Sequence, residues 1–304
     1  MQINSLSTSF ILTADIGGSH ITAGICHLES YSILTQSITR IEVDSKGPAE
    51  SILARWESAF EQVLQKNITA SVSGLSIAMP GPFDYEKGIS YIKGLDKYEA
   101  LYGMDIKQHL AELLSIDPGV IRFRNDAEST IAGEVLSGAG RNYRRVMGIT
   151  LGTGLGSAFT ENAVTKDLNL GSNPYRETIA DDYLSTRWFL RRYLELTGVT
   201  LKGGVKELAE LAPGSAMARD LFIEFANNMS DFLSGPIAQY GPEVLVVCGN
   251  IAKASQFFLP QLTKRLNSIP IKLARLGENA PLIGAAAMFD DLNHTEPSSS
   301  VTKL

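Results

Sequence analysis

The sequence predicts an α/β protein of two similar domains, and three observations lead to this fold class. Its 304 residues allow two domains of roughly 100–200 residues each, and 44% hydrophobic with 20% charged residues is typical of a chain with a buried core. Apolar, strand-like segments alternate with segments of helical periodicity. A strand, a glycine-rich turn and a returning strand occur twice, over 10–26 and 146–160. Two halves with such a hairpin suggest two domains that close on one ligand.

The N-terminal half alternates strands with helices of one apolar face. Gly47-Pro48 opens a helix whose apolar residues recur at helical spacing, and Pro80-Gly81-Pro82 ends a strand because no regular element continues through it. The predicted elements are a hairpin over 10–26, a strand over 33–43, a helix with its apolar face over 52–64, a strand over 72–79, an irregular tyrosine-rich segment over 84–103, a helix capped by Asp105 and ending at 114, a strand over 120–124 and a helix from 125 to about 136.

The C-terminal half has the same character. Its predicted elements are a strand pair over 146–160, an irregular segment over 161–178, helices over 179–196, about 205–211 and 215–238, a buried strand over 243–248, a helix over 257–266 and a last helix opened by Pro281. We expect a first domain over 9–122, a larger second domain over 123–283, a C-terminal helix at about 284–293 that packs back on the first domain, and a polar tail over 294–304.

Charge and composition exclude several classes of protein. A net charge of −6 and a pI near 5.4 argue against a nucleic-acid-binding surface, which should be basic. The N-terminus lacks the basic and apolar regions of a signal peptide, and no apolar segment approaches the ~20 residues that a membrane helix needs. Cys26 and Cys248 each lie in an apolar, strand-like segment, so we expect buried free thiols in a reducing compartment, the cytoplasm.

The first glycine turn predicts a site for a nucleotide triphosphate with magnesium. Gly17 and Gly18 let backbone N–H groups approach an anion because no Cβ stands in the way, and Ser19 follows them. An acid at the mouth of such a loop, Asp15, would repel phosphate unless a divalent cation lay between them. The alternative is an Asp-Gly-Gly turn with no ligand, and the segment alone does not decide between the two.

The second glycine turn, Gly152-Thr153-Gly154-Leu155-Gly156, can also hold phosphate oxygens with backbone N–H groups and one hydroxyl. A dinucleotide-binding fingerprint would need a helix directly after it, whereas a strand-like segment follows. A P-loop is excluded because the chain contains no Gly-Lys-Ser/Thr. A plain turn remains the alternative here as well.

Two further polar positions lie where a strand ends. Asn125 and Asp126 join a strand to a helix, so Asp126 is either a helix cap or a carboxylate in a ligand crevice, kept ionised by the helix N-terminus. Gly249 and Asn250 follow a buried strand and are either a helix-start turn or a flat surface for a purine base.

Five motifs together resemble the ROK family of sugar kinases and repressors, which belongs to the actin/hexokinase/heat-shock-ATPase superfamily. They are Asp15-x-Gly-Gly-Ser19, Pro80-Gly-Pro82, Asn125-Asp126-Ala127, Leu151-Gly-Thr-Gly-Leu-Gly156 and Cys248-Gly-Asn250, in this order over about residues 10–290. The resemblance implies two ribonuclease-H-like (actin-like ATPase) domains that flank a cleft for nucleotide and sugar. It further implies an ATP-dependent hexose-type kinase, small-molecule sugar as the partner, no nucleic acid or membrane, and a homodimer.

The resemblance also implies roles for individual residues. Asp126 would be the catalytic base, and Asp15 would organise Mg²⁺, directly or through water. The phosphates would be held by Gly17, Gly18, Ser19, Gly152, Thr153 and Gly154, with Gly249 and Asn250 near the adenosine. The sugar would be held by Asn125, Asp126, Gly81, Asn169 and Asp181.

The chain departs from the family pattern between residues 165 and 185. This stretch has no Cys or His, so the zinc loop of the family is absent and we expect no structural zinc. Asn169 and Ser172 replace a Glu and a His, while Asp181 stands where a Glu follows the zinc loop. A family member that binds sugar or nucleotide without catalysis is therefore one alternative. A sugar-sensing repressor is another, although about nine residues precede the first strand and such repressors carry an N-terminal helix-turn-helix.

Overall fold

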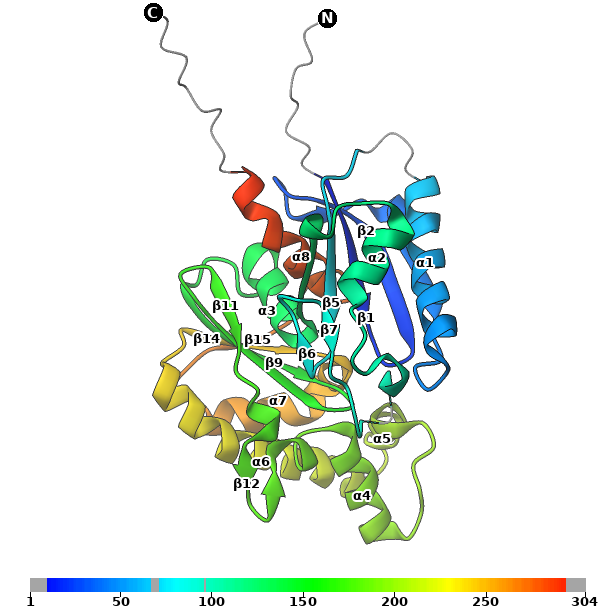
Figure 1. Cartoon of the computed structure of the whole chain (residues 1–304). Coiled ribbons are helices and arrows are strands. Elements are labelled where there is room, and N and C mark those ends of the chain that lie inside the picture. Colours follow the sequence, from blue (N-terminus) through cyan, green and yellow to red (C-terminus); the bar gives the residue numbers. More distant parts are fainter. Residues whose placement is uncertain (1–9, 67–70, 96, 294–304) are drawn as a thin grey trace, which may run out of the picture. The chain divides into compact units, whose positions relative to one another are not determined.

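The computed structural model describes the chain over residues 10–66, 71–95 and 97–293 (Figure 1). The predicted polar tail, 294–304, lies outside the described residues. Within them, no helix is both long enough and apolar enough to cross a membrane.

The chain divides into two compact units, each with its own mixed β-sheet. Unit 1 comprises the residues up to Ser129 and those from Pro281 onward, and unit 2 runs from Thr130 to Ala280. The boundaries expected from the sequence, after 122 and after 283, differ from this division by a few residues.

The sheet of unit 1 has six strands in the order β3-β2-β1-β5-β8, with β4 also paired to β2. β2 runs antiparallel to β1, whereas β5 and β8 run parallel to β1. These strands are β1 (Phe10–Ile16), β2 (His20–His27), β3 (Ser32–Ile33), β4 (Thr39–Glu42), β5 (Leu75–Met79) and β8 (Ile121–Asn125). A separate small hairpin is formed by β6 (Phe83–Asp84) and β7 (Ile89–Ser90).

Helices α1 (Ala49–Lys66) and α2 (Ile106–Leu114) belong to unit 1. The α1 residues Ile52, Trp56 and Phe60 are buried, so the periodic apolar face of this helix forms part of the core of unit 1. Asp105 caps α2 as predicted, because its side chain accepts a hydrogen bond of 2.8 Å from the backbone N–H of Gln108.

The C-terminal helical segment contributes to unit 1. It consists of α8 (Asn279–Ala286) and a 3₁₀ helix over Ala287–Asn293. Thr13 Oγ1 on β1 donates to the carbonyl oxygen of Leu282 at 2.8 Å, and Arg124 at the end of β8 donates to that of Gly284 at 2.9 Å. These bonds tie the end of the described chain to the strands that lead into the predicted site.

The sheet of unit 2 has five strands in the order β11-β10-β9-β14-β15. β9, β10 and β11 are antiparallel neighbours, whereas β14 runs parallel to β9 and β15 parallel to β14. The two sheets therefore share one plan, a central hairpin extended by two parallel strands. The strands are β9 (Arg145–Leu151), β10 (Leu155–Glu161), β11 (Val164–Asp167), β14 (Val244–Cys248) and β15 (Ile271–Leu273), with a small hairpin of β12 (Pro174–Tyr175) and β13 (Thr178–Ile179).

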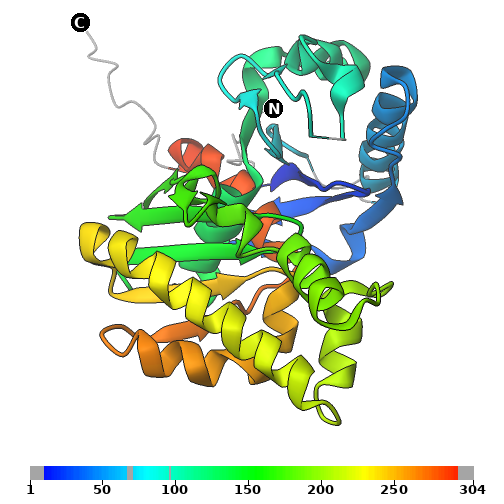
Figure 2. The same cartoon turned by 90° about the horizontal axis from the view of Figure 1, so that it is seen from below.

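Helices cover the unit 2 sheet, and α6 and α7 lie side by side beneath it (Figure 2). They are α3 (Asp126–Ser137, most of which lies in unit 2), α4 (Thr186–Thr197), α5 (Gly204–Leu211), α6 (Ala216–Tyr240) and α7 (Ser255–Arg265). Their core contains a chain of aromatic contacts, in which the rings of Phe189 and Phe225 lie 4.6 Å apart and those of Phe225 and Phe258 lie 5.7 Å apart.

Three predicted elements are wrong in extent. The strand expected over 33–43 is interrupted because the buried Ser37 turns inward, where its Oγ accepts a hydrogen bond from Ile25 N at 2.8 Å. The helix expected from 179 begins at Thr186, because β13 pairs with β12 and Ala180 N donates to Asn173 O at 2.9 Å. The segment 161–178, expected to be irregular, contains β11 and most of the β12–β13 hairpin.

Both cysteines are buried free thiols, as predicted, and each unit contains one of them. Burial raises the pKa of Cys26 to about 12, with a smaller contribution from the negative charge of Asp290. Burial also raises the pKa of Cys248, and the nearby carboxylate of Glu134 adds to this effect.

Glu134 is a fully buried carboxylate on α3 that holds three backbone N–H groups of unit 2. It accepts hydrogen bonds from Ala139 N at 2.7 Å, Arg275 N at 2.9 Å and Leu276 N at 2.8 Å. One side chain thus joins the end of α3 to the segment that precedes α8.

Replacing Glu134 by Ala should lower the free energy of unfolding by about 2–4 kcal/mol, because three buried donors lose their acceptor. Urea unfolding followed by circular dichroism measures this. Glu210→Ala on α5 is the control, since Glu210 is exposed and forms a surface pair with Lys206. Equal losses in the two variants would show that the Glu134 contacts contribute no more than a surface charge.

Candidate active site

The first glycine turn joins β1 to β2 in unit 1 and is held by backbone hydrogen bonds at both ends. Gly17 N donates to His20 O at 2.9 Å, and Val43 N donates to Ser19 O at 2.9 Å. A Cβ added at Gly18 would meet no atom within 4 Å, so the outer side of the turn is open to a ligand. The Ser19 hydroxyl lies 2.8 Å from His20 Nδ1.

Tyr98 holds this turn in place through a hydrogen bond, a role that sequence analysis did not identify. Its side chain is fully buried, and its hydroxyl donates to the carbonyl oxygen of Gly17 at 2.5 Å. Burial, and secondarily the negative charge of Asp15, raise the pKa of Tyr98 above that of an ordinary tyrosine, so the hydroxyl stays a donor. Tyr98 belongs to the tyrosine-rich segment over 84–103, and this hydrogen bond ties that segment to the first glycine turn.

Asp15 is half-buried near the end of β1, where it pairs in register with Thr22 on β2 and Ala78 on β5. Among the described residues, no three His, Cys, Asp or Glu side chains gather to form a metal cage. Mg²⁺ does not need such a cage, because it is usually held by one or two carboxylates, substrate phosphates and water. A single carboxylate beside a turn that is predicted to bind phosphate therefore fits a magnesium ion that arrives with a nucleotide.

Asn125 and Asp126 lie at the junction of β8 and α3, also in unit 1. Asn125 Oδ1 accepts hydrogen bonds from Ala127 N at 2.9 Å and Glu128 N at 3.1 Å, so Asn125 is the residue that caps the helix. Asp126 follows as the first helical residue, and its Oδ1 accepts from Ala127 N at 2.9 Å. The capping function considered for Asp126 is thus carried mainly by its neighbour.

A tyrosine connects this junction to the Pro80-Gly81-Pro82 turn. Asn125 Nδ2 donates to the hydroxyl of Tyr85 at 3.2 Å, and that hydroxyl donates to Met79 O at 3.1 Å. A Cβ at Gly81 would lie 3.2 Å from the same hydroxyl. Gly81 and Asn125 therefore lie near the same tyrosine hydroxyl.

The second glycine turn joins β9 to β10 in unit 2. It is closed by a hydrogen bond of 3.0 Å from Gly152 N to Gly154 O, and Thr186 N, the first residue of α4, donates to Gly152 O at 2.8 Å. No atom lies within 4 Å of a Cβ added at Gly152, so this turn is open too. Thr153 lies at its tip.

Gly249 lies at the end of β14, next to this turn. Cys248 pairs in register with Thr150, and Gly249 has a φ of +90°. A Cβ at Gly249 would overlap the backbone of Leu151, so only glycine allows the chain to pass here. Asn250 follows as the first residue of a 3₁₀ helix over Asn250–Ala254.

The segment in which the chain departs from the family pattern contains Asn169, Ser172 and Asp181, and it lies next to the second glycine turn. Asn169 has a left-handed backbone, and its Oδ1 accepts a hydrogen bond of 3.0 Å from Ser172 Oγ, so these two replacements bond to each other. Asp181 accepts hydrogen bonds from Leu155 N and from Arg187. A Cβ at Gly154 would lie 2.9 Å from Asp181 Oδ1, which places this carboxylate directly against the turn.

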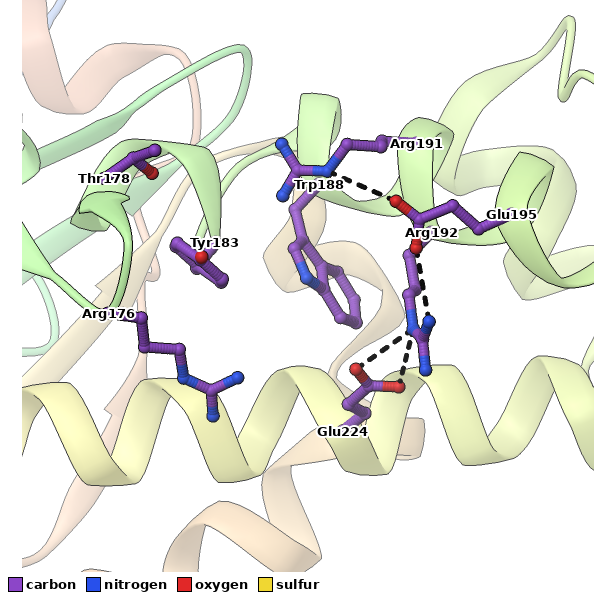
Figure 3. Close-up of a pocket in the computed structure, with 8 residues that line it drawn as sticks. All are labelled: Arg176, Thr178, Tyr183, Trp188, Arg191, Arg192, Glu195 and Glu224. Atoms are coloured by element: carbon purple, nitrogen blue, oxygen red, sulfur yellow. Dashed lines mark hydrogen bonds and ion pairs between the residues drawn. The ribbon is translucent and has the colours of Figure 1, made fainter.

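Unit 2 also has a surface pocket of about 350 Å³ between the β12–β13 hairpin, α4 and α6 (Figure 3). Within it, Arg192 pairs with Glu224 at 3.1 Å and with Glu195 at 3.2 Å. The pocket is lined by Arg176, Thr178, Tyr183, Trp188, Arg191, Arg192, Glu195 and Glu224. It contains none of the predicted site residues.

Two sheets of one plan, each with a glycine turn between its central strands, are typical of the actin-like ATPase fold. Residues 11–167, just over half of the chain, match the ROK family. The chain therefore belongs to the ROK family.

Its curated relatives include sugar kinases of similar length. A glucokinase from Thermotoga maritima is 21% identical, with 92% of this chain and 97% of the relative aligned. An N-acetyl-D-glucosamine kinase from Haemophilus influenzae is 23% identical, with 90% of this chain and 97% of the relative aligned.

Solved structures share the fold. A ROK family glucokinase from Streptomyces griseus, in complex with glucose and AMPPNP, has a TM-score of 0.74 and 21% identity over 92% of this chain and 98% of that one. A ROK family transcriptional regulator has a TM-score of 0.77 and 15% identity over 93% of this chain and 78% of that one. The fold is thus common to catalytic and regulatory members.

Replacing Tyr98 by Phe should lower the free energy of unfolding by about 1–2 kcal/mol at neutral pH, because Gly17 O loses its buried donor. The folded-state pKa of Tyr98 is raised, so this contribution is fully present below the ordinary tyrosine pKa of about 10 and is lost as pH rises through the folded pKa. Denaturant unfolding of both proteins between pH 7 and 11 measures this. Tyr91→Phe, at an exposed tyrosine, is the control, and a difference independent of pH would contradict the assignment.

Proposed function

We propose that this chain is an ATP-dependent sugar kinase, which transfers the γ-phosphoryl group of MgATP to a hydroxyl of a hexose-type sugar. The observation that carries the proposal is the repeated turn. Both sheets present an open glycine turn between equivalent strands, and a carboxylate, Asp15, lies beside the first of them. Membership of a family that includes glucokinases and N-acetylglucosamine kinases supports it.

In this proposal the two turns bind the phosphates with backbone N–H groups, aided by the hydroxyls of Ser19 and Thr153. Asp15 would hold Mg²⁺, directly or through water, and the bound ion would supply neutralisation of phosphate charge. Gly249 and Asn250 lie near the adenosine, and the absence of a Cβ at Gly249 lets the end of β14 pack against the backbone of Leu151 in the second turn.

Asp126 acts as the general base. It is the first residue of α3 and so lies at the N-terminus of that helix, directly after the strand end that carries Asn125. The sugar hydroxyl gives its proton to Asp126 as its oxygen bonds to the γ-phosphorus, while the bond from that phosphorus to the β,γ-bridging oxygen breaks and ADP leaves. A carboxylate suffices because the proton is transferred late, when the oxygen is already bonding to phosphorus.

Asn125 and Gly81 hold the sugar next to this base, and the network through Tyr85 fixes both. The family pattern suggests Asn169 and Asp181 as further sugar contacts, and in this proposal Asn169 makes one. ADP release measured with glucose, N-acetylglucosamine, mannose and N-acetylmannosamine tests the proposal. Absence of turnover on every sugar would contradict it.

A non-catalytic sugar-binding or regulatory role is the second candidate, and one observation favours it. Asn169 and Ser172 replace two residues of the family pattern, and their side chains hydrogen-bond to each other. If catalysis has been lost, calorimetry should show sugar or nucleotide binding without phosphoryl transfer. Phosphoryl transfer to sugar at any appreciable rate would instead support the kinase function.

Replacing Asp126 by Asn should reduce kcat by about 10²- to 10⁴-fold, because a general base is lost, while AMPPNP binding stays unchanged. A coupled ADP-release assay and calorimetry measure the two quantities. Asp117→Asn is the matched control, since Asp117 lies in the same unit and an amide oxygen can still accept its hydrogen bond from Gly119 N. An Asp126→Asn variant as active as the parent would show that another group accepts the proton.

A further inference from the structure

The residues assigned to phosphate binding bring no positive charge of their own. They are glycines, Ser19 and Thr153, and the carboxylate of Asp15 lies beside the first turn. A magnesium nucleotide triphosphate still carries about two negative charges, and phosphoryl transfer is mostly positioning and neutralisation of such charge. Enzymes of this chemistry commonly place an Arg or Lys at the phosphates.

We propose that Arg187 is this cation, a phosphate-binding residue of unit 2 that Asp181 holds beside the second glycine turn. The inference rests on the proposed kinase function and adds to it a residue that the glycine motifs do not contain. All groups involved lie within unit 2.

The position of Arg187 follows from the first turn of α4. Thr186, the residue before it, donates its backbone N–H to Gly152 O at 2.8 Å, so the start of this helix is bonded to the glycine turn. A helix N-terminus also favours bound anions, and Arg187 is the second residue of a helix of 12 residues.

Asp181 fixes both the turn and the guanidinium group. One of its carboxylate oxygens accepts from Leu155 N on the far side of the turn, and the other accepts from Arg187. Because Gly154 has no Cβ, the carboxylate can approach the turn closely. A single side chain therefore sets the position of the turn relative to Arg187.

The Asp181–Arg187 pair presents its positive partner to solvent. The Asp181 side chain is 18% exposed, whereas that of Arg187 is 60% exposed. A guanidinium has five N–H donors, and Asp181 is the only partner of Arg187 among the described residues. The remaining donors can therefore contact an anion bound at the turn. By contrast, Arg192 on the same helix is engaged by both Glu195 and Glu224 (Figure 3).

The pair also explains how a carboxylate is tolerated against a phosphate-binding turn. Alone, Asp181 would repel phosphate, whereas paired with Arg187 it contributes no net charge. This makes Asp181 a positioning residue of the phosphate site, a role different from the sugar contact that the family pattern suggests.

Calorimetric titration of the full chain with Mg-AMPPNP and with adenosine tests the inference. Arg187→Gln should weaken AMPPNP binding by about 10- to 100-fold, the range of a charge-assisted hydrogen bond, and leave adenosine binding unchanged. Arg187→Lys should restore part of the loss, because it keeps the charge without the planar fork. Arg192→Gln is the matched control, with the same charge change on the same helix.

Asp181→Asn separates positioning from sugar binding. The amide can still accept from Leu155 N but no longer carries the charge that holds Arg187, so AMPPNP affinity should fall by about 3- to 10-fold while the sugar KM stays unchanged. A selective rise in sugar KM would overturn the positioning role. Unchanged AMPPNP affinity in Arg187→Gln, or equal losses for AMPPNP and adenosine, would overturn the role of Arg187.

These outcomes also separate the inference from the kinase proposal. A parent protein that phosphorylates sugar, with an Arg187→Gln variant of equal nucleotide affinity, refutes only the inference. AMPPNP binding that depends on Arg187, without transfer to any sugar, refutes only the kinase. A parent that does not bind AMPPNP refutes both.

Discussion

The register of the parallel strands is the constraint on which the candidate site depends. In unit 1, Asp15 pairs with Ala78 and Met79 pairs with Asn125, so three chain segments end together at one edge of the sheet. In unit 2, Cys248 pairs with Thr150, which brings Gly249 against the backbone of Leu151. A slip of one residue would turn each of these side chains to the opposite face. The buried strands β5 and β14 prevent such a slip, because all of their residues are enclosed in the core.

The two glycine turns are alike in sequence but are held by different means. In unit 1 the support is a side chain from a distant loop, the hydroxyl of Tyr98 on Gly17 O. In unit 2 the support comes from one segment that contains Asp181 and Thr186 and bonds to both sides of the turn. In the family pattern, the zinc loop comes just before the positions of this segment. Local hydrogen bonds thus stabilise a region in which the chain has no cysteine to bind metal.

The sequence predicted the parts of the fold that depend on local pattern. Both glycine hairpins, the Asp105 cap and the buried strand ending at Cys248 were recognisable because adjacent residues determine them. The start of α4 was not, because apolar spacing continues through Leu184 although the backbone of Ala180 is bonded to Asn173. Short strands such as β12 and β13 depend on pairing, which two residues cannot signal.

In the candidate site, too, the residues set by local pattern were predicted and those set by distant contacts were not. Residue types and their order pointed to Asp15, Asn125 and Asp126, since strand ends and glycine turns are visible in sequence. The supports were hidden: Tyr98 lies 81 positions from the carbonyl that it binds, and Asp181 lies 26 positions from Leu155. No periodicity links such residues, because only the folded chain brings them together. The Asn125 cap was missed for a smaller reason, since Asn and Asp are nearly equal as caps and stand side by side.

The two buried thiols can report on local unfolding of the protein. Only a thiolate reacts readily with alkylating reagents, and burial with a raised pKa suppresses the thiolate of both Cys26 and Cys248. Because each unit contains one of them, the natural chain carries an independent chemical probe in each half. The rate at which each cysteine is alkylated can be followed by mass spectrometry of its peptide. The two rates would therefore distinguish local unfolding of one unit from that of the other, without any engineered residue.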